Sequence, residues 1–201
     1  MRALYVTHPQ VDLDASVPVP LWGLSAVGRQ RAEAFASSGA VPEGAPIFSS
    51  GERKALELAD LIAARTGTPV QIDHQMGEND RSATGFLPPA LFEDTANRFF
   101  EQPGQSIDGW ERALDAQARI VDAVQRALSG LSQPGPVIFC GHGAVGTLLK
   151  CHLAARTIAR SEDQGNGGNP GGGNCLVFDI TERRLICDWT AMETLAHDWF
   201  A

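Results

Sequence analysis

The sequence predicts an α/β fold: a three-layer sandwich in which helices cover both faces of a mainly parallel central sheet. Short apolar, β-branched runs alternate along the chain with segments of helical periodicity, which is typical of parallel strands joined by crossover helices. The 201 residues suit one domain, and 43% hydrophobic with 20% charged residues is a globular composition. We therefore expect residues 1–201 to form a single domain with a loop and a helix inserted near 76–109.

The N-terminal segment predicts a buried strand followed by a helix. The run ALYVT at 3–7 is β-branched and aromatic, and it ends abruptly at His8-Pro9. A loop rich in Pro and Asp follows to about Trp22. Ser25 has the residue type and position of an N-cap, so a helix is expected to begin there.

A second strand and a second helix come next. PIFSS at 46–50 predicts the strand, and the apolar residues that follow it fall on one helical stripe. Ser49 and Glu52 have the spacing of a capping box, which predicts the start of this helix. Gly67 ends the helix, and VQID at 70–73 predicts a third short strand.

The middle of the chain predicts a long loop and two helices. The loop runs from 76 to 89, helices are expected over 90–101 and 110–128, and the second helix has Leu114 on its inward face. PVIFC at 136–140 then predicts a buried strand.

The C-terminal third predicts a helix, a Gly-rich loop and a hairpin. The helix follows Gly141-His142-Gly143. The stretch 161–174 has the composition of a flexible loop and lacks the Lys-Ser/Thr of a phosphate-binding P-loop. The runs 175–180 and 184–189 predict two closing strands that pair around Thr181-Glu182.

Composition and charge exclude several classes of partner. Asp and Glu number 24 and Lys and Arg 16, so the net charge of −8 argues against nucleic acid or a membrane surface as partner. No apolar run reaches membrane-spanning length, and the N-terminal apolar run is too short for a signal peptide. The four cysteines have neither CxxC nor zinc spacing, which indicates reduced thiols in a cytoplasmic protein without a metal site.

Polar residues gather where three predicted strands end. His8 and His142 each follow an apolar strand, and Arg53 and Lys54 open the helix after Ser50. Ligands of α/β sheets bind beyond the carboxyl ends of the strands. Cations in a first helical turn oppose the helix dipole, whereas the free amides of that turn attract anions, so a bound phosphate would explain both. A solvated Arg-Lys pair and a turn histidine before a proline explain these residues as well, and their spacing alone does not decide.

In their order and spacing, these motifs resemble the histidine phosphatase superfamily, in its phosphoglycerate-mutase-like branch. The resemblance covers nearly the whole chain and rests on the following residues: the strand ending in His8; Leu24, Ser25, Gly28, Arg29 and Ala32; Ser49 to Ala55; Glu78; and Gly141 to Gly143. It implies a phosphoglycerate-mutase-like fold and a small phosphorylated substrate, with no metal and no other cofactor.

The resemblance also implies roles for individual residues. His8 would be the nucleophile that accepts the phosphoryl group, and His142 a second ligand of the phosphate. Lys54 stands at the position of an arginine on the second helix, with Arg53 beside it. Glu78 would be the general acid that protonates the leaving group.

Three departures weaken the expected phosphate site, and one of them is Pro9, which removes an amide donor next to His8 and favours extended backbone there. The family's Arg-His-Gly reads Thr-His-Pro here, with Thr7 in place of a cation that makes two charge-assisted hydrogen bonds. Lys54 replaces a planar guanidinium by a point charge. We expect Arg81, near Glu78 in sequence, to supply the missing charge, and Thr7 and Gly143 to complete the phosphate-binding set.

The sequence therefore predicts a phosphatase that hydrolyses a small phosphoester through a phosphohistidine on His8. A non-catalytic module that binds a phosphorylated ligand or protein on the same fold is the alternative, and a phosphoglycerate-type mutase is a weaker one. Trp22, Phe86 and Trp110 either line the mouth of the site or serve ordinary packing. No sequence pattern indicates an oligomeric state.

Overall fold

The computed structural model describes residues 1–179 and 181–200. Its six strands form one sheet in the order β3-β2-β4-β1-β5-β6. The strands are β1 (Arg2–Thr7), β2 (Ile47–Ser49), β3 (Val70–Ile72), β4 (Val137–Gly141), β5 (Asn174–Asp179) and β6 (Arg184–Ala191). The four strands from β3 to β1 are parallel, and β5 and β6 extend the sheet antiparallel beyond β1. The prediction of a mainly parallel sheet closed by a hairpin is therefore confirmed, with Ile180 of the predicted hairpin outside the described residues.

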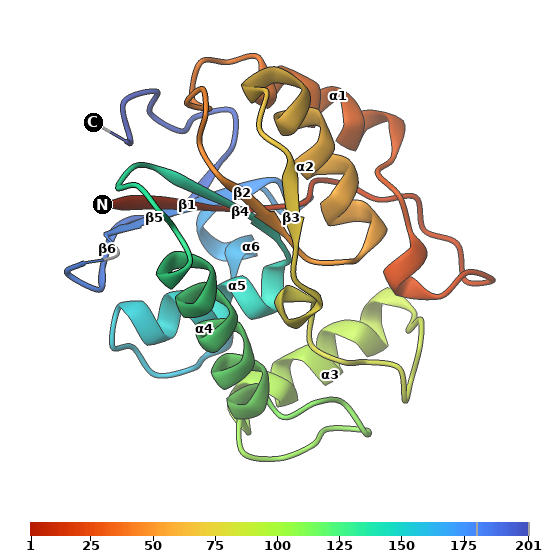
Figure 1. Cartoon of the computed structure of the whole chain (residues 1–201). Coiled ribbons are helices and arrows are strands. Elements are labelled where there is room, and N and C mark those ends of the chain that lie inside the picture. The colour runs from red at the N-terminus through yellow and green to blue at the C-terminus, as the bar shows by residue number, and fades with distance from the viewer. Residues whose placement is uncertain (180, 201) are drawn as a thin grey trace.

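Helices cover both faces of this sheet. They are α1 (Ala26–Ala36), α2 (Arg53–Thr66), α3 (Pro89–Glu101), α4 (Ala113–Ser129), α5 (Gly143–Leu153) and α6 (Gln164–Gly167), with the 3-10 turns η1 (Val19–Leu21), η2 (His74–Met76) and η3 (Arg160–Glu162). In Figure 1, α1 and α2 lie on one side of the sheet and α3, α4 and α5 on the other.

The alternation of side chains along β1 builds the two cores between these layers. Leu4 and Val6 point to the core beneath α1 and α2, whereas Ala3 and Tyr5 point to the core beneath α3, α4 and α5. Successive side chains of a strand face opposite sides, so a strand covered on both faces is apolar throughout. This explains why ALYVT is a continuous apolar run.

The predicted helix starts have different outcomes. Ser25 caps α1 as expected, because its hydroxyl accepts a hydrogen bond of 3.1 Å from the amide of Gly28. The capping box is wrong: Ser49 belongs to β2, and Glu52 is itself the N-cap residue of α2 without a side-chain cap. The Glu52 carboxylate is held by tertiary contacts described below.

Two other local predictions need correction. The stretch 161–174 is not a loop throughout, since it contains the end of η3, all of α6 and the first residue of β5. Leu114, expected to face inward, is 49% exposed because it lies about 100° round α4 from the buried Ala113 that precedes it.

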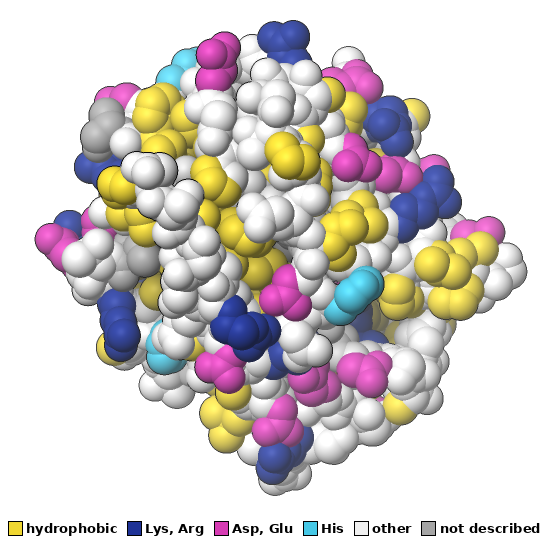
Figure 2. Space-filling view, in the orientation of Figure 1, with side chains coloured by type: hydrophobic (Ala, Val, Ile, Leu, Met, Phe, Trp, Pro, Cys, Tyr) yellow, Lys and Arg dark blue, Asp and Glu magenta, His cyan; other side chains and the backbone are white. Residues whose placement is uncertain are grey.

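Positive and negative side chains are mixed on the visible surface. On the face in Figure 2, Lys and Arg side chains are interspersed with Asp and Glu and form no continuous basic patch. Within the described residues, no helix combines the length and apolarity needed to cross a bilayer. In the same residues, His, Cys, Asp and Glu form no group of three that could hold a metal ion.

Candidate active site

The parallel pairing of β1 and β4 brings the two candidate histidines together. Thr7 is in register with Gly141, so His8 and His142 leave the sheet side by side. The amide of His8 continues the pairing with a 3.0 Å hydrogen bond to the carbonyl of Gly141. The two imidazole rings stand edge to face with their centroids 5.3 Å apart. A pair of motifs 134 positions apart in sequence thus becomes one site.

The ring of half-buried His8 is fixed by its own backbone neighbour. Its Nδ1 lies 2.9 Å from the carbonyl oxygen of Pro9. Since a carbonyl only accepts hydrogen bonds, Nδ1 carries the hydrogen in the neutral ring and Nε2 keeps its lone pair. Burial, followed by the positive charge of Lys54, lowers the pKa of His8 to about 4. His8 is therefore neutral near pH 7, the state that a nucleophilic imidazole requires.

His142 is fully buried and is held at the opposite ring nitrogen. Its Nε2 lies 2.7 Å from the hydroxyl oxygen of Ser50 and 3.5 Å from Oε1 of Glu52. Its Nδ1 is buried and meets no hydrogen-bond partner among the described residues. The Tyr5 hydroxyl is hydrogen-bonded to both backbone groups of His142: it accepts from the amide at 3.0 Å and donates to the carbonyl at 3.1 Å. Burial lowers the pKa of His142 to about 4, although the charges of Glu52 and Glu78 oppose this shift.

Glu52 and Lys54 form an ion pair beneath the two histidines. The carboxylate of Glu52 binds the Lys54 ammonium, which also donates a 3.0 Å hydrogen bond to the carbonyl of Val19. Burial by itself raises the pKa of Glu52, but the charges of His142 and Lys54 and its hydrogen bonds outweigh burial and lower it to about 2. Lys54, expected to bind phosphate, is thus paired with a carboxylate that the sequence analysis assigned to a helix cap.

Glu78 lies against the N-terminus of α5. Its Oε2 accepts a 3.3 Å hydrogen bond from the amide of Ala144, and its Oε1 accepts one of 3.1 Å from Val145. Free amides and the helix dipole attract carboxylates to this position. The amide of Glu78 in turn donates to Oε1 of Glu52 at 2.7 Å. The candidate general acid is therefore anchored at both its backbone and its side chain.

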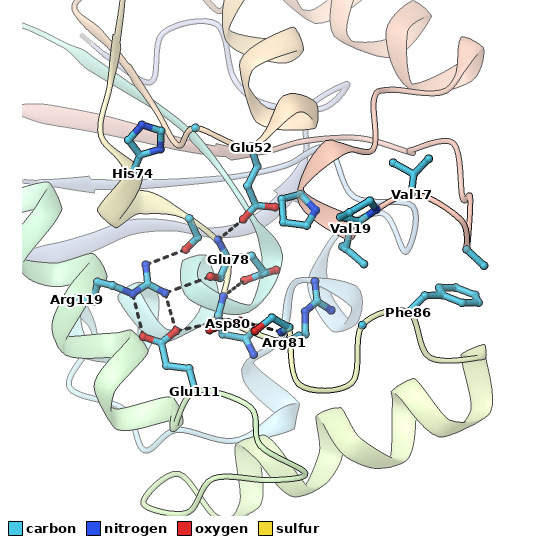
Figure 3. Close-up of a pocket in the computed structure, with 18 of the residues that line it drawn as sticks. Val17, Val19, Glu52, His74, Glu78, Asp80, Arg81, Phe86, Glu111 and Arg119 are labelled. Carbon is cyan, nitrogen blue, oxygen red and sulfur yellow. Dashed lines mark hydrogen bonds and ion pairs between the residues drawn. The ribbon is translucent and has the colours of Figure 1, made fainter.

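Arg119 of α4 holds the loop that carries Glu78. Its guanidinium donates to the carbonyls of Gln75, Gly77 and Glu78 at 2.7, 3.0 and 3.2 Å, and it pairs with both carboxylate oxygens of Glu111. Figure 3 shows this fan of hydrogen bonds from α4 to the loop. The sequence analysis missed Arg119, because an arginine in an amphipathic helix gives no signal that its partners are backbone carbonyls far away in the chain.

Five of the predicted site residues line one cavity of about 350 Å³: His8, Lys54, Glu78, Arg81 and Gly143. The hollow of about 790 Å³ shown in Figure 3 adjoins it and shares Val19, Glu78, Asn79 and Arg81 as a common wall.

Arg81 is held in the cavity by aromatic rings. Its guanidinium carbon lies 5.2 Å from the ring centroid of Phe92 and 5.5 Å from that of Trp110, both within cation–π range. Among the residues that the structure describes, Arg81 forms no ion pair. Its positive charge also lowers the pKa of His8, by less than burial and the charge of Lys54 do. Arg81 therefore brings a positive charge without a carboxylate partner to the cavity that His8 also lines.

Three of the predicted site residues do not line the cavity, and the first of them, His142, is fully buried beside His8. Arg53 has a side chain that is 63% exposed and pairs with Glu57 on the outer face of α2. Adjacent helical residues point about 100° apart, so with Lys54 turned inward Arg53 faces solvent. Thr7 is fully buried, and its hydroxyl donates to the side-chain oxygen of Gln164 at 2.7 Å and accepts from the amide of Asn174 at 2.9 Å. The Thr7 hydroxyl thus ties β1 to the segment before β5.

The comparison with protein families agrees with these motifs. Residues 18–178 match the histidine phosphatase superfamily (branch 1). The chain belongs to this superfamily. No curated protein sequence matches the chain significantly.

Several solved structures share the fold of this superfamily member. A protein titled mycobacterial hydrolase 2 has a TM-score of 0.76 and 22% identity, with 98% of this chain and 93% of that chain covered. A mycobacterial glucosyl-3-phosphoglycerate phosphatase has a TM-score of 0.75 and 22% identity over 94% of this chain and 97% of its own. YhfR from Bacillus stearothermophilus has a TM-score of 0.74 and 17% identity over 98% of both chains. At these identities the likeness shows a phosphoglycerate-mutase-like fold.

Proposed function

We propose that this histidine phosphatase superfamily member hydrolyses a small phosphomonoester through a phosphohistidine on His8. The observation that carries the proposal is the neutral His8 ring in the cavity, with Nδ1 bound to the Pro9 carbonyl and Nε2 left as the nucleophile. Of the similar structures, the mycobacterial glucosyl-3-phosphoglycerate phosphatase has been solved in complex with inorganic phosphate, and it supports a phosphorylated substrate.

The proposed reaction has two displacements at phosphorus. First, Nε2 of His8 forms a bond to phosphorus while the bond to the leaving oxygen breaks, and Glu78 gives that oxygen a proton. Second, a water oxygen attacks phosphorus, Glu78 takes the proton of the water, and the phosphorus–nitrogen bond breaks. Phosphate leaves, and both His8 and Glu78 return to their starting states.

Positive charge and amides around the cavity would hold the phosphoryl oxygens. Lys54 and Arg81 supply the charge, and the amide of Gly143 at the start of α5 supplies a helix N-terminal donor. We assign Arg81 the role of the arginine that Thr7 replaces. His142 would take part through its unpartnered Nδ1, which a phosphoryl oxygen can satisfy once the ring is protonated.

Non-catalytic binding of a phosphorylated ligand is the second candidate. It is favoured by the loss of a cation at position 7, since each charge-assisted hydrogen bond contributes about 1.5–3 kcal/mol. Phosphoglycerate-type mutase activity is a weaker candidate, because it requires a tightly held phosphoenzyme.

The test is hydrolysis of an aryl phosphate between pH 5 and 7.5 by the wild type and by His8→Ala. We expect activity in the wild type that disappears in the variant. Absence of activity in both proteins, with phosphate still bound, would indicate the binding module, and equal activity in both would show that the site lies elsewhere. Arg53→Gln is the matched control, since Arg53 lies outside the cavity.

A further inference from the structure

The walls of the His8 cavity beyond the phosphoryl end are unusually aromatic. The chain has 14 aromatic residues (9 Phe, 4 Trp and 1 Tyr), and five of them line this one cavity. They are Trp22, Phe92, Phe99, Phe100 and Trp110. Three of the five come from α3, and because Phe99 and Phe100 are almost fully buried, Phe92 is the ring of this helix that offers surface to the cavity. Aromatic walls favour ligands with apolar or aromatic surface.

The charge of Arg160 in this outer part of the cavity is already paired. The guanidinium of Arg160 binds the carboxylates of both Glu93 and Asp163, and its carbon lies 5.8 Å from the ring centroid of Phe100. One cation thus faces two anions. A carboxylate or second phosphate on the substrate would have to displace these partners and would meet two negative charges. The side of the wall formed by Glu93, Arg160 and Asp163 therefore disfavours a second anionic group.

The cavity is also small. Its volume of about 350 Å³ is near the lower end of the range for small-molecule sites. The phosphoryl group occupies the end near His8, Lys54 and Glu78, and the leaving group takes the rest of this cavity, on the near side of the wall shared with the larger hollow.

We propose that the cavity selects phosphomonoesters of compact, uncharged alcohols with an aromatic or apolar body over phosphorylated sugar acids and polyols. This specificity rests on the proposed function, because it takes the His8 end of the cavity as the phosphoryl site. The leaving alcohol packs against Phe92 of α3, and Arg160 stays bound to Glu93 and Asp163.

The test compares three substrates that all release primary alcohols: 2-phenylethyl phosphate, glycerol 3-phosphate and 3-phosphoglycerate. Similar leaving groups keep differences in intrinsic reactivity small. We expect kcat/KM for 2-phenylethyl phosphate to exceed that for the other two at least tenfold. Calorimetric binding of 3-phenylpropylphosphonate and 2-carboxyethylphosphonate to the same proteins measures the preference whether or not turnover occurs.

Two variants locate the preference in the outer wall. Phe92→Ala is expected to lower the ratio of 2-phenylethyl phosphate to glycerol 3-phosphate about fivefold, whereas Leu91→Ala leaves it unchanged because Leu91 is 58% exposed and lies outside the cavity. Glu93→Gln removes one carboxylate from Arg160 and is expected to raise kcat/KM for 3-phosphoglycerate several-fold.

The outcomes separate the specificity from the proposed function. Preferred binding of the phenyl phosphonate without turnover would overturn the proposed hydrolysis and support the specificity. Turnover that depends on His8 with equal or reversed preference, unchanged in Phe92→Ala and Glu93→Gln, would support the hydrolysis and overturn the specificity.

Discussion

The two histidines of the site are alike in charge and opposite in attachment. Both are neutral near pH 7, with pKa values lowered to about 4 by burial. His8 is anchored at Nδ1 by a backbone carbonyl, and His142 is anchored at Nε2 by the Ser50 hydroxyl and Glu52. Each ring therefore keeps the other nitrogen for chemistry. The two neighbouring imidazoles therefore differ in role according to which ring nitrogen is hydrogen-bonded.

The anchor of His8 also explains how the site accommodates Pro9. Proline removes an amide donor, but its carbonyl oxygen remains, and this oxygen receives the Nδ1 hydrogen of His8. The tautomer of His8 thus depends on the backbone and is retained with Pro in place of Gly. Thr7 is the more serious departure, because its buried hydroxyl is no substitute for a cation.

The largest effect is expected from removing each histidine in turn. His8→Ala should lower kcat/KM by about 10⁴-fold or more, because the group that forms the covalent bond is lost. His142→Asn should lower it by about 10²–10³-fold, because it removes one stabilising group. Steady-state kinetics on an aryl phosphate measure both. A reversed order of the two losses would mean that the roles are exchanged.

The pH dependence of the free energy of unfolding tests whether His142 is neutral in the folded protein. The unfolded ring has a pKa near 6.5 and the folded ring one of about 4, so the unfolded chain binds the proton first as pH falls. Stability is therefore full above pH 6.5 and declines toward pH 4.5, by about 2–3 kcal/mol for this buried group. Urea unfolding from pH 7.5 to 4.5 measures the decline, and His142→Asn should reduce its slope. An unchanged slope in the variant would contradict a neutral His142.

Arg81→Gln tests the comparison of the two histidines on the His8 side. Loss of a charge-assisted contact to the phosphoryl group should lower kcat/KM about 10–100-fold. Arg53→Gln is the matched control and should change kcat/KM less than twofold, since its side chain is 63% exposed and outside the cavity. Equal effects of the two variants would remove Arg81 from the phosphate site.

Ser50→Ala tests the comparison of the two histidines on the His142 side, and we expect it to have the smallest effect on activity of these variants. Loss of one neutral hydrogen bond to Nε2 should lower kcat about fivefold by loosening the ring. Ser49→Ala is the control, because its buried hydroxyl has no hydrogen-bond partner among the described residues. We expect that variant to retain full activity, and a loss in both variants would point to packing of the strand end as the cause.

Sequence reasoning predicted the sheet and the two histidines because both depend on short-range patterns. Apolar runs give the strands, and residues directly after them lie at the ligand-binding edge. Glu52 shows where such patterns fail: its spacing from Ser49 is that of a capping box, yet its partners are Lys54, His142 and the amide of Glu78. Local spacing does not distinguish a carboxylate that caps a helix from one held by the tertiary fold.

The positioning of Glu78 was beyond the sequence for a related reason. Arg119 binds backbone carbonyls 41 to 44 positions away, and any residue types there would present the same carbonyls. In the same way, the choice between Arg53 and Lys54 depended on which way α2 turns about its axis, and the fold turns Lys54 inward.

Trapping of the phosphoenzyme tests the role of His8 most directly. The wild type is mixed with ³²P-labelled substrate, quenched in alkali, digested and mapped. We predict label on the peptide that contains His8, stable in alkali and lost in acid, as phosphohistidine is. No label should appear in His8→Ala, and label should persist in His142→Asn. Rapid turnover by the wild type without label on His8, or label that remains in His8→Ala, would contradict a phosphohistidine at this position.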